Sequence, residues 1–127
     1  MPAVPGTPTV RALRGATRVD DDTPDEVTSR TQELLTELMA RNGLVHDDVI
    51  SAIFTATADV TCMFPATAAR GVGFGDVPLL CASEIPVPGS MPRCLRVLLH
   101  VHTSRTRDEL RHVYLNGAQV LRDDLPG

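Results

Sequence analysis

Apolar and polar residues alternate along the chain with two different periods, and these periods predict its secondary structure. Four stretches are either continuously apolar or alternate with period two, which predicts strands at 9–16, 49–56, 77–84 and 93–103. Between Val27 and Met39 the apolar residues instead recur at helical spacing. Thr23-Pro24-Asp25-Glu26 before this helix has the form of a capping box, and Asn42-Gly43 after it is a common helix stop.

The segments between and after these elements are shorter. Pro65 favours the start of a second helix within 64–70, and three glycines within 71–75 predict a turn after it. This glycine pattern follows a helix and precedes a strand, which is the reverse of the order in a phosphate-binding loop. Two short extended pieces are expected at 112–115 and 119–121.

The order of these elements, β-α-β-α-β-β, predicts an α+β fold in which a mixed sheet carries its helices on one face. A chain of 127 residues is long enough for a single core. We therefore expect one domain over residues 9–127, preceded by a flexible, proline-rich extension at residues 1–8.

The longest predicted strand is apolar on both of its faces. Leu95, Val97 and Leu99 point to one side. Cys94 and Leu98 point to the other side, with Arg96 between them. Two helices cover one face of a sheet, and the chain has no further helix for the second face. A closed homo-oligomer is the economical way to cover it.

Composition and charge narrow the range of possible functions further. The net charge of −4 argues against a nucleic-acid partner. No apolar run approaches the roughly 20 residues that span a bilayer, and the first residues lack the pattern of a secretion signal. Three cysteines without a C-x-x-C pair are typical of reduced thiols in the cytoplasm.

Two arginines, Arg14 and Arg96, stand inside otherwise apolar strands. A guanidinium in such a place is costly unless an anion or a carboxylate meets it. Arg96 could pair with an internal carboxylate such as Glu84, and Arg14 could reach water from an edge strand. The alternative for both is a pocket that holds a small anion with more than one negative charge, and the two interpretations of Arg96 are compatible.

The chain offers no motif for nucleophilic or metal chemistry. There is no G-x-S-x-G sequence, and Cys81 lies in an apolar strand as a buried thiol would. His100 and His102 share a strand face, but no second ligand pair at zinc-site spacing accompanies them. We therefore expect neither a metal nor a cofactor, and a site that acts through charge and orientation alone.

Five groups of residues, spread from about residue 10 to residue 125, together resemble the AroH-class chorismate mutases. These groups are Arg14-Gly15-Ala16-Thr17; Phe64-Pro65-Ala66 with Arg70; Cys81 with Glu84; Cys94-Leu95-Arg96; and Arg111-His112-Val113-Tyr114-Leu115 leading to Val120-Leu121-Arg122. The resemblance implies the conversion of chorismate to prephenate, the branch step toward phenylalanine and tyrosine. It also implies a homotrimer in which three sheets form a pseudo-α/β barrel, with an active site between each pair of neighbours.

The resemblance also implies roles for individual residues. Arg96, Glu84 and Arg14 would be catalytic. The substrate-binding residues would be Tyr114, Cys81, Arg70, Phe64, Ala66, Leu79, Leu80, Leu121 and Arg122. The chain departs from the family pattern in its proline-rich extension, in a glycine turn that is shorter and lacks a tryptophan, in Thr67 where a lysine can occur, and in Leu80 where threonine is frequent.

Two other functions stay open at this point. One is an imine or enamine deaminase of the trimeric Rid type, which also binds carboxylates through an arginine between subunits. The other is a trimer that binds an aromatic-pathway metabolite without converting it.

Overall fold

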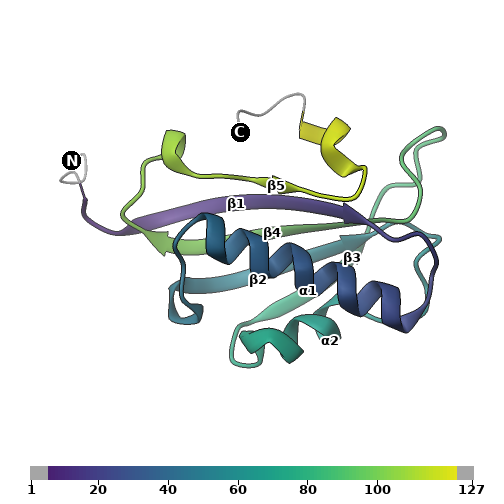
Figure 1. Cartoon of the computed structure of the whole chain (residues 1–127), viewed down its shortest axis with the longest axis horizontal. Helices are drawn as coiled ribbons and strands as arrows, with labels where there is room; N and C mark the ends of the chain where they lie inside the picture. Colours follow the sequence, from purple (N-terminus) through teal and green to yellow (C-terminus); the bar gives the residue numbers. More distant parts are fainter. Residues whose placement is uncertain (1–5, 123–127) are drawn as a thin grey trace.

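The computed structural model describes residues 6–122, and a five-stranded mixed sheet with two helices dominates it (Figure 1). The strands are β1 (Thr9–Arg18), β2 (Val49–Ala56), β3 (Leu79–Ser83), β4 (Cys94–Thr103) and β5 (Val113–Tyr114). The helices are α1 (Pro24–Arg41) and α2 (Pro65–Ala69). The predicted α+β class, with helices on one face of a mixed sheet, is confirmed. Most of the predicted extension, residues 1–5, lies outside the described residues.

The strands lie in the order β3-β2-β4-β1-β5. β4 is antiparallel to both of its neighbours, whereas the outer pairs β2/β3 and β1/β5 are parallel. The register places Arg96 between Ala16 on β1 and Thr55 on β2. It also places Leu98 beside Arg14. Because residues directly opposite each other share a face, both predicted arginines project from the same side of the sheet.

α1 begins as the sequence predicts, with one difference. The Thr23 hydroxyl accepts a hydrogen bond from the Glu26 backbone N–H at 3.2 Å, as an N-cap should. The Glu26 carboxylate, however, accepts from the backbone N–H of Asp20 at 2.9 Å, so it anchors the incoming chain instead of completing a capping box. The helix ends at Arg41, and Asn42 caps it by donating its side-chain amide to the carbonyl of Leu38 at 2.9 Å.

A glycine on β1 allows α1 to pack directly onto the sheet. A Cβ at Gly15 would lie 2.9 Å from Cδ1 of Leu38 and 3.1 Å from Cδ1 of Leu34, closer than side chains normally approach. Both leucines are buried. The helix is thus seated next to Arg14, and its packing fixes the strand that carries this arginine.

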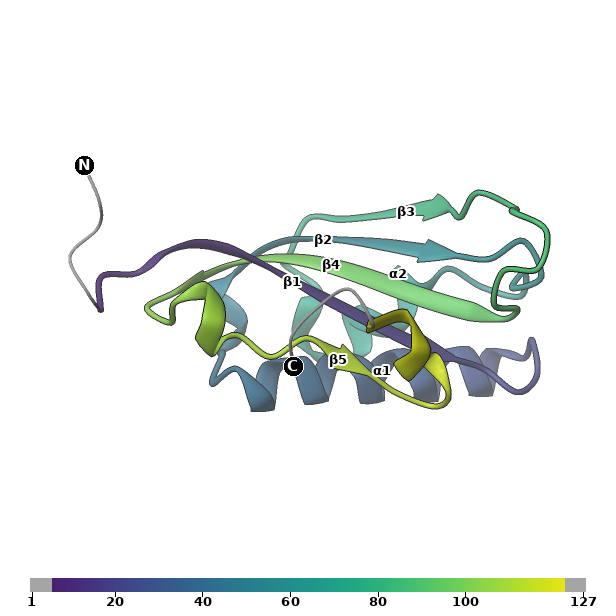
Figure 2. The same cartoon turned by 90° about the horizontal axis from the view of Figure 1, so that it is seen from above.

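The two faces of the sheet differ sharply in burial. α1 and α2 lie on one side of the strands (Figure 2), where the main core is formed. Leu95, Val97 and Leu99 of β4 point into this side and are buried. On the opposite face Val10 is 56 % exposed and Leu80 is 62 % exposed. The two faces predicted for the long strand are therefore confirmed, and neither α1 nor α2 covers the second face.

One local prediction was wrong. The piece expected to be extended at 119–121 lies in a 3₁₀ turn, Ala118–Arg122. The turn predicted at the glycine-rich segment is present as a π-helical turn, Arg70–Phe74, in which Gly73 has a φ of +97° and leaves room for the ring of His46. β1 lies between β4 and β5 in the sheet, and β5 pairs with it only at Gly15 and Ala16, just after Arg14.

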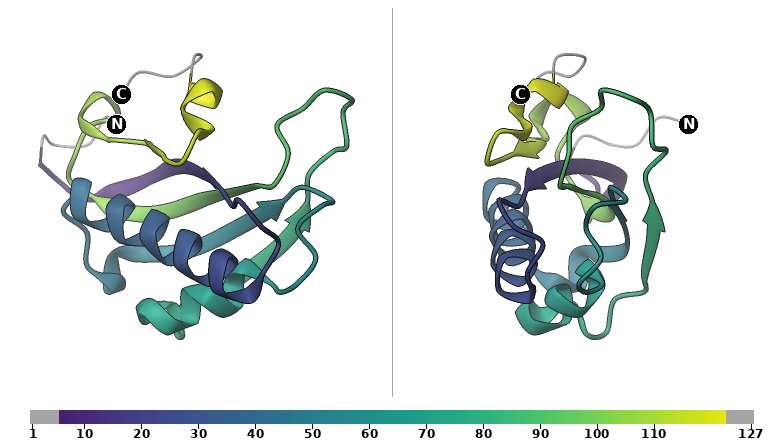
Figure 3. Two further views of the ribbon diagram at one scale, coloured as in Figure 1. Left: turned by 45° about the vertical axis from the view of Figure 1, so that its right-hand side comes forward. Right: turned by 90° about the vertical axis from the view of Figure 1, so that its right-hand side faces the viewer.

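The loop between β3 and β4 projects beyond the end of the sheet (Figure 3). This loop carries exposed apolar side chains, Ile85 and Val87. In the described part of the chain, no helix combines the length and the hydrophobicity that crossing a membrane requires.

Candidate active site

A cavity of about 310 Å³ opens on the uncovered face of the sheet. Its polar lining consists of Arg14 from β1, Thr55 from β2, Arg96 from β4, Tyr114 from β5, and Glu84 just after β3. Four of the strands therefore supply one polar group each, and the residue just after β3 supplies the fifth. The predicted catalytic residues, together with the predicted tyrosine, lie around one cavity in a single chain.

Arg96 and Glu84 form an ion pair within this cavity. The Nε of Arg96 lies 2.8 Å from Oε1 of Glu84, and the N–H is not aligned with this oxygen as a hydrogen bond requires. The same oxygen accepts a directed hydrogen bond from the Thr55 hydroxyl at 2.8 Å. The backbone N–H of Glu84 also donates to the carbonyl of Ala56 at 3.0 Å. β2 therefore holds the Glu84 carboxylate in place, and this carboxylate in turn attracts Nε of the Arg96 guanidinium.

Arg14 is held by the segment that carries β5. Its Nε and Nη2 donate to the hydroxyl of Tyr114 at 3.2 and 3.0 Å. Its backbone N–H donates to Nδ1 of His112 at 2.9 Å. Two cationic side chains and one carboxylate leave the cavity with a net positive charge, which favours an anionic ligand.

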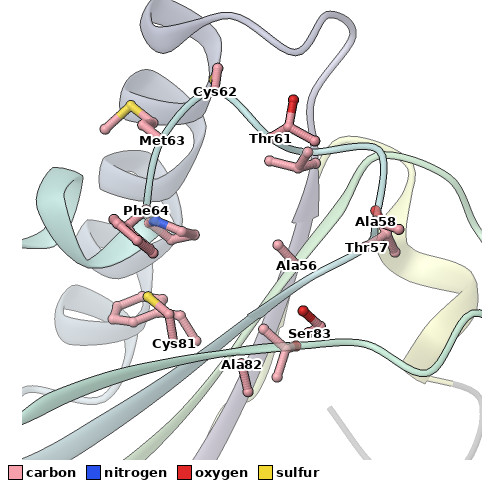
Figure 4. A pocket seen from close by; sticks show the side chains of 14 residues that line it. Ala56, Thr57, Ala58, Thr61, Cys62, Met63, Phe64, Cys81, Ala82 and Ser83 are labelled. Atoms are coloured by element: carbon pink, nitrogen blue, oxygen red, sulfur yellow. The ribbon is translucent and has the colours of Figure 1, made fainter.

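A second, larger cavity of about 560 Å³ lies at the end of β2 and β3 (Figure 4). The loop that carries Phe64 forms one wall, and the strand residues Ala82 and Ser83 form another (Figure 4). Cys81 lines this cavity too, and Thr55 borders both cavities. Phe64 is 69 % exposed, an unusual state for a phenylalanine and one that calls for a ligand or a partner surface.

One carboxylate ties this loop to the start of α1. Asp22 accepts hydrogen bonds from the backbone N–H and the hydroxyl of Thr61 at 2.9 and 2.7 Å, and from the backbone N–H of Cys62 at 3.2 Å. These bonds favour the ionised form and lower the pKa of Asp22 to about 2. Burial and the nearby Asp22 carboxylate raise the pKa of the Cys62 thiol, so this cysteine is a poor nucleophile.

The other predicted binding residues lie in several places. Leu121 packs against the cluster that contains Tyr114, and Ala66 is buried in the main core. Arg70 is exposed at the end of α2. Leu79 and Leu80 point to opposite faces of β3, Leu79 toward the main core and Leu80 toward the open face. Arg122 ends the last turn, and its side chain lies outside the described part of the chain.

Three contributors were missed by sequence reasoning: Thr55, His112 and Asp22. Thr55 is an ordinary strand residue, and only the register that places it beside Arg96 marks it. His112 stands within a motif that the sequence did single out. Asp22 is one of three consecutive aspartates, and nothing local distinguishes it from its neighbours.

The described residues hold no group of three His, Cys, Asp or Glu side chains that could bind a metal ion. His100 has the hydroxyl of Ser51 at 3.4 Å from its Nδ1. Cys94 is buried, and burial raises the pKa of its thiol.

The model of the family described as chorismate mutase type I matches residues 10–125. The chain belongs to this family. Chorismate mutase AroH from Thermus thermophilus is 48 % identical over 117 residues, which covers 91 % of this chain and 96 % of that protein. Chorismate mutase AroH from Bacillus subtilis is 39 % identical, with coverages of 91 % and 92 %.

A solved structure supports the same assignment at the level of the fold. The structure of a chorismate mutase from Clostridium thermocellum superposes with a TM-score of 0.85 at 51 % sequence identity, and the match covers 87 % of this chain and 98 % of that one. The resemblance predicted from the five residue groups is thereby confirmed.

Proposed function

We propose that the protein converts chorismate to prephenate in the cationic cavity around Arg14, Glu84 and Arg96. The observation that carries this proposal is the gathering of these residues around one net positive cavity in a chain of the chorismate mutase type I family. Chorismate is a dicarboxylate, and its charge matches that of the cavity. The reaction is an isomerisation, and it places the chain at the branch toward phenylalanine and tyrosine.

The reaction is an intramolecular Claisen rearrangement, in which an ether C–O bond breaks and a C–C bond forms within one molecule. No proton, electron or group passes to the protein. The protein therefore contributes in two ways: it holds the flexible dianion in its compact reactive conformer, and it stabilises the charge that separates as the ether bond lengthens. Fixed charged and hydrogen-bonding side chains suffice for both.

Arg96 is assigned to the ether oxygen, where negative charge grows in the transition state. The ion pair with Glu84 engages Nε, which leaves the terminal nitrogens of the guanidinium to the substrate. Because Thr55 fixes the carboxylate, the guanidinium is held in place before the substrate binds. Such preorganisation avoids the reorganisation that water would need around the same charge.

Glu84 is assigned to the ring side of the substrate, where positive character grows and where a carboxylate can accept from the ring hydroxyl. Arg14 and Tyr114, which already contact each other, are assigned to the side-chain carboxylate. Cys81 is assigned to the ring hydroxyl, and Phe64 and Leu121 to the apolar walls. Apolar walls lower the local dielectric constant and strengthen the electrostatic contribution of Arg96.

We further propose that the protein is a homotrimer, with each site completed between two neighbours. Two observations support this. Neither α1 nor α2 lies over the face of the sheet that carries the cavity, and this face exposes Val10 and Leu80. Of the proposed substrate-binding residues, Tyr114 lines one cavity of the chain, whereas Cys81 and the largely exposed Phe64 line the other. Three sheets packed through this face would form the pseudo-barrel and bury these side chains.

The three cysteines are free thiols, which favours the reducing cytoplasm as the compartment of the protein. The sequence left two alternatives open. Membership of the chorismate mutase type I family favours the mutase over a Rid-type deaminase. A non-catalytic binder would hold chorismate without consuming it.

The decisive experiment is to follow chorismate absorbance with purified protein while measuring its molar mass by light scattering in the same preparation. Loss of chorismate with equimolar appearance of prephenate, from a species of three times the chain mass, is the expected result. Tight binding without turnover would overturn the catalytic assignment. Turnover by a monomer would overturn the trimer.

A further inference from the structure

One short segment holds Arg14 at two points. The guanidinium donates to the hydroxyl of Tyr114, and the backbone N–H donates to Nδ1 of His112, which lies two residues before that tyrosine. The backbone contact extends the parallel pairing of β1 with β5, in which Gly15 lies opposite Val113. The imidazole of His112 therefore accepts the Arg14 N–H just before the β1/β5 pairing begins, in the place where a backbone carbonyl would accept within that pairing.

This contact defines the state of the imidazole. A nitrogen that accepts from an N–H carries no proton, so the ring is neutral and its proton lies on Nε2. Partial burial and the positive charge of Arg14 both lower the pKa of His112. The histidine is therefore neutral at physiological pH.

We propose that neutral His112 is a positioning residue that fixes Arg14 for the carboxylate of the substrate. The inference rests on the proposed role of Arg14 and extends it to a residue that does not itself line the cavity. It also gives the site a dependence on pH. Below the pKa of His112, a proton on Nδ1 would face the Arg14 N–H, so that two donors would meet and the contact would be lost.

The other charged groups around His112 do not account for its lowered pKa. On its own segment, Arg111 donates to the backbone carbonyls of Asp108 and Leu110. Just after α1, the neutral amide of Asn42 pairs with the backbone of Arg111. From β1, Arg14 supplies the charge that acts on the ring.

Three proteins test the proposal: the wild type, His112→Asn and His112→Ala. Asparagine keeps an acceptor oxygen near the position of Nδ1 and does not titrate, whereas alanine removes the acceptor. At pH 7.5 we expect KM for chorismate to be close to wild type in His112→Asn. In His112→Ala we expect KM to rise by about fivefold to tenfold, with a smaller change in kcat.

The dependence on pH separates positioning from a general loss of structure. As pH falls below 6.5, KM of the wild type should rise, and KM of His112→Asn should stay nearly constant. His46, His100 and His102 are present in both proteins, so their titration cancels in the comparison. Equal acid-side profiles, or an unchanged KM in His112→Ala, would overturn the proposal.

A measurement that does not depend on activity separates this inference from the proposed function. In nitrogen-15 spectra, the backbone amide of Arg14 should shift with the titration of His112 in the wild type and should not titrate in His112→Asn. Amide exchange at Arg14 should be faster in His112→Ala than in His112→Asn. Absence of chorismate turnover would refute the proposed function. An Arg14 amide whose chemical shift and exchange rate do not depend on His112 would refute the inference.

Discussion

Glu84 and Arg96 meet at 2.8 Å on the open face of the sheet, where the arginine side chain is 42 % exposed and the carboxylate 25 % exposed. An ion pair this accessible to water contributes little to folding stability. Its effect is on geometry, because a long side chain is held in one direction toward the cavity. The pair is therefore best tested through catalysis.

Replacing Arg96 should damage catalysis more than substrate binding. Loss of one preorganised donor to the developing charge costs on the order of 10²–10³ in rate, so Arg96→Ala should lower kcat by at least that factor. Arg96→Lys should restore little, because an ammonium cannot both pair with Glu84 and present a planar fork to the substrate. Steady-state kinetics measure both variants, and a kcat for Arg96→Ala near that of the wild type would refute the role of Arg96.

Thr55 should matter for kcat although it carries no charge. Thr55→Val keeps the shape of the side chain and removes the donor to Glu84. The carboxylate then loses its anchor, and we expect kcat to fall about tenfold. Thr55→Ser is the matched control, because it retains the hydroxyl and should stay close to wild type. If valine and serine behave alike, Glu84 is positioned by something other than this hydroxyl.

The strands and the main helix could be predicted because their periodicity reflects burial on one or two faces. Arg14 and Arg96 were identifiable for the related reason that a charge inside an apolar strand needs a partner. Thr55 and His112 were not, because their roles depend on which strand lies beside which, and pairing between distant segments leaves no local signal. The segment at 119–121 was wrongly expected to be extended, because three residues are too few to distinguish the period of a strand from that of a 3₁₀ turn.

Asp22 should stabilise the fold at neutral pH and lose this effect in acid. Its pKa is about 2 in the folded chain against 3.8 for a free carboxyl, so the folded state favours the ionised form. The resulting stability is present in full above the unfolded pKa and disappears as pH falls through about 2. At pH 7 the wild type should therefore melt at a higher temperature than Asp22→Asn, and this difference should shrink between pH 4 and pH 2.

Asp21→Asn is the control for Asp22, since it removes the same charge from the neighbouring position. Its melting temperature should follow that of the wild type across the same range. Because Asp22 holds the loop that leads to Phe64, Asp22→Asn should also raise KM for chorismate at pH 7. A melting difference that is independent of pH would show that the hydrogen bonds, and not the ionisation, carry the effect.

The proposed trimer can be tested with two valines of similar exposure. Val10 lies on the open face of β1 and is 56 % exposed, whereas Val45 precedes β2 in a surface loop and is 63 % exposed. A glutamate at position 10 would place a charge in the proposed interface, where no partner is prepared for it. We therefore expect Val10→Glu to shift the molar mass toward the monomer and to lower activity most at low protein concentration. Val45→Glu should keep both the mass and the activity of the wild type. If Val10→Glu keeps the wild-type mass at every concentration, this part of the sheet faces solvent and the proposed packing of the three sheets is wrong.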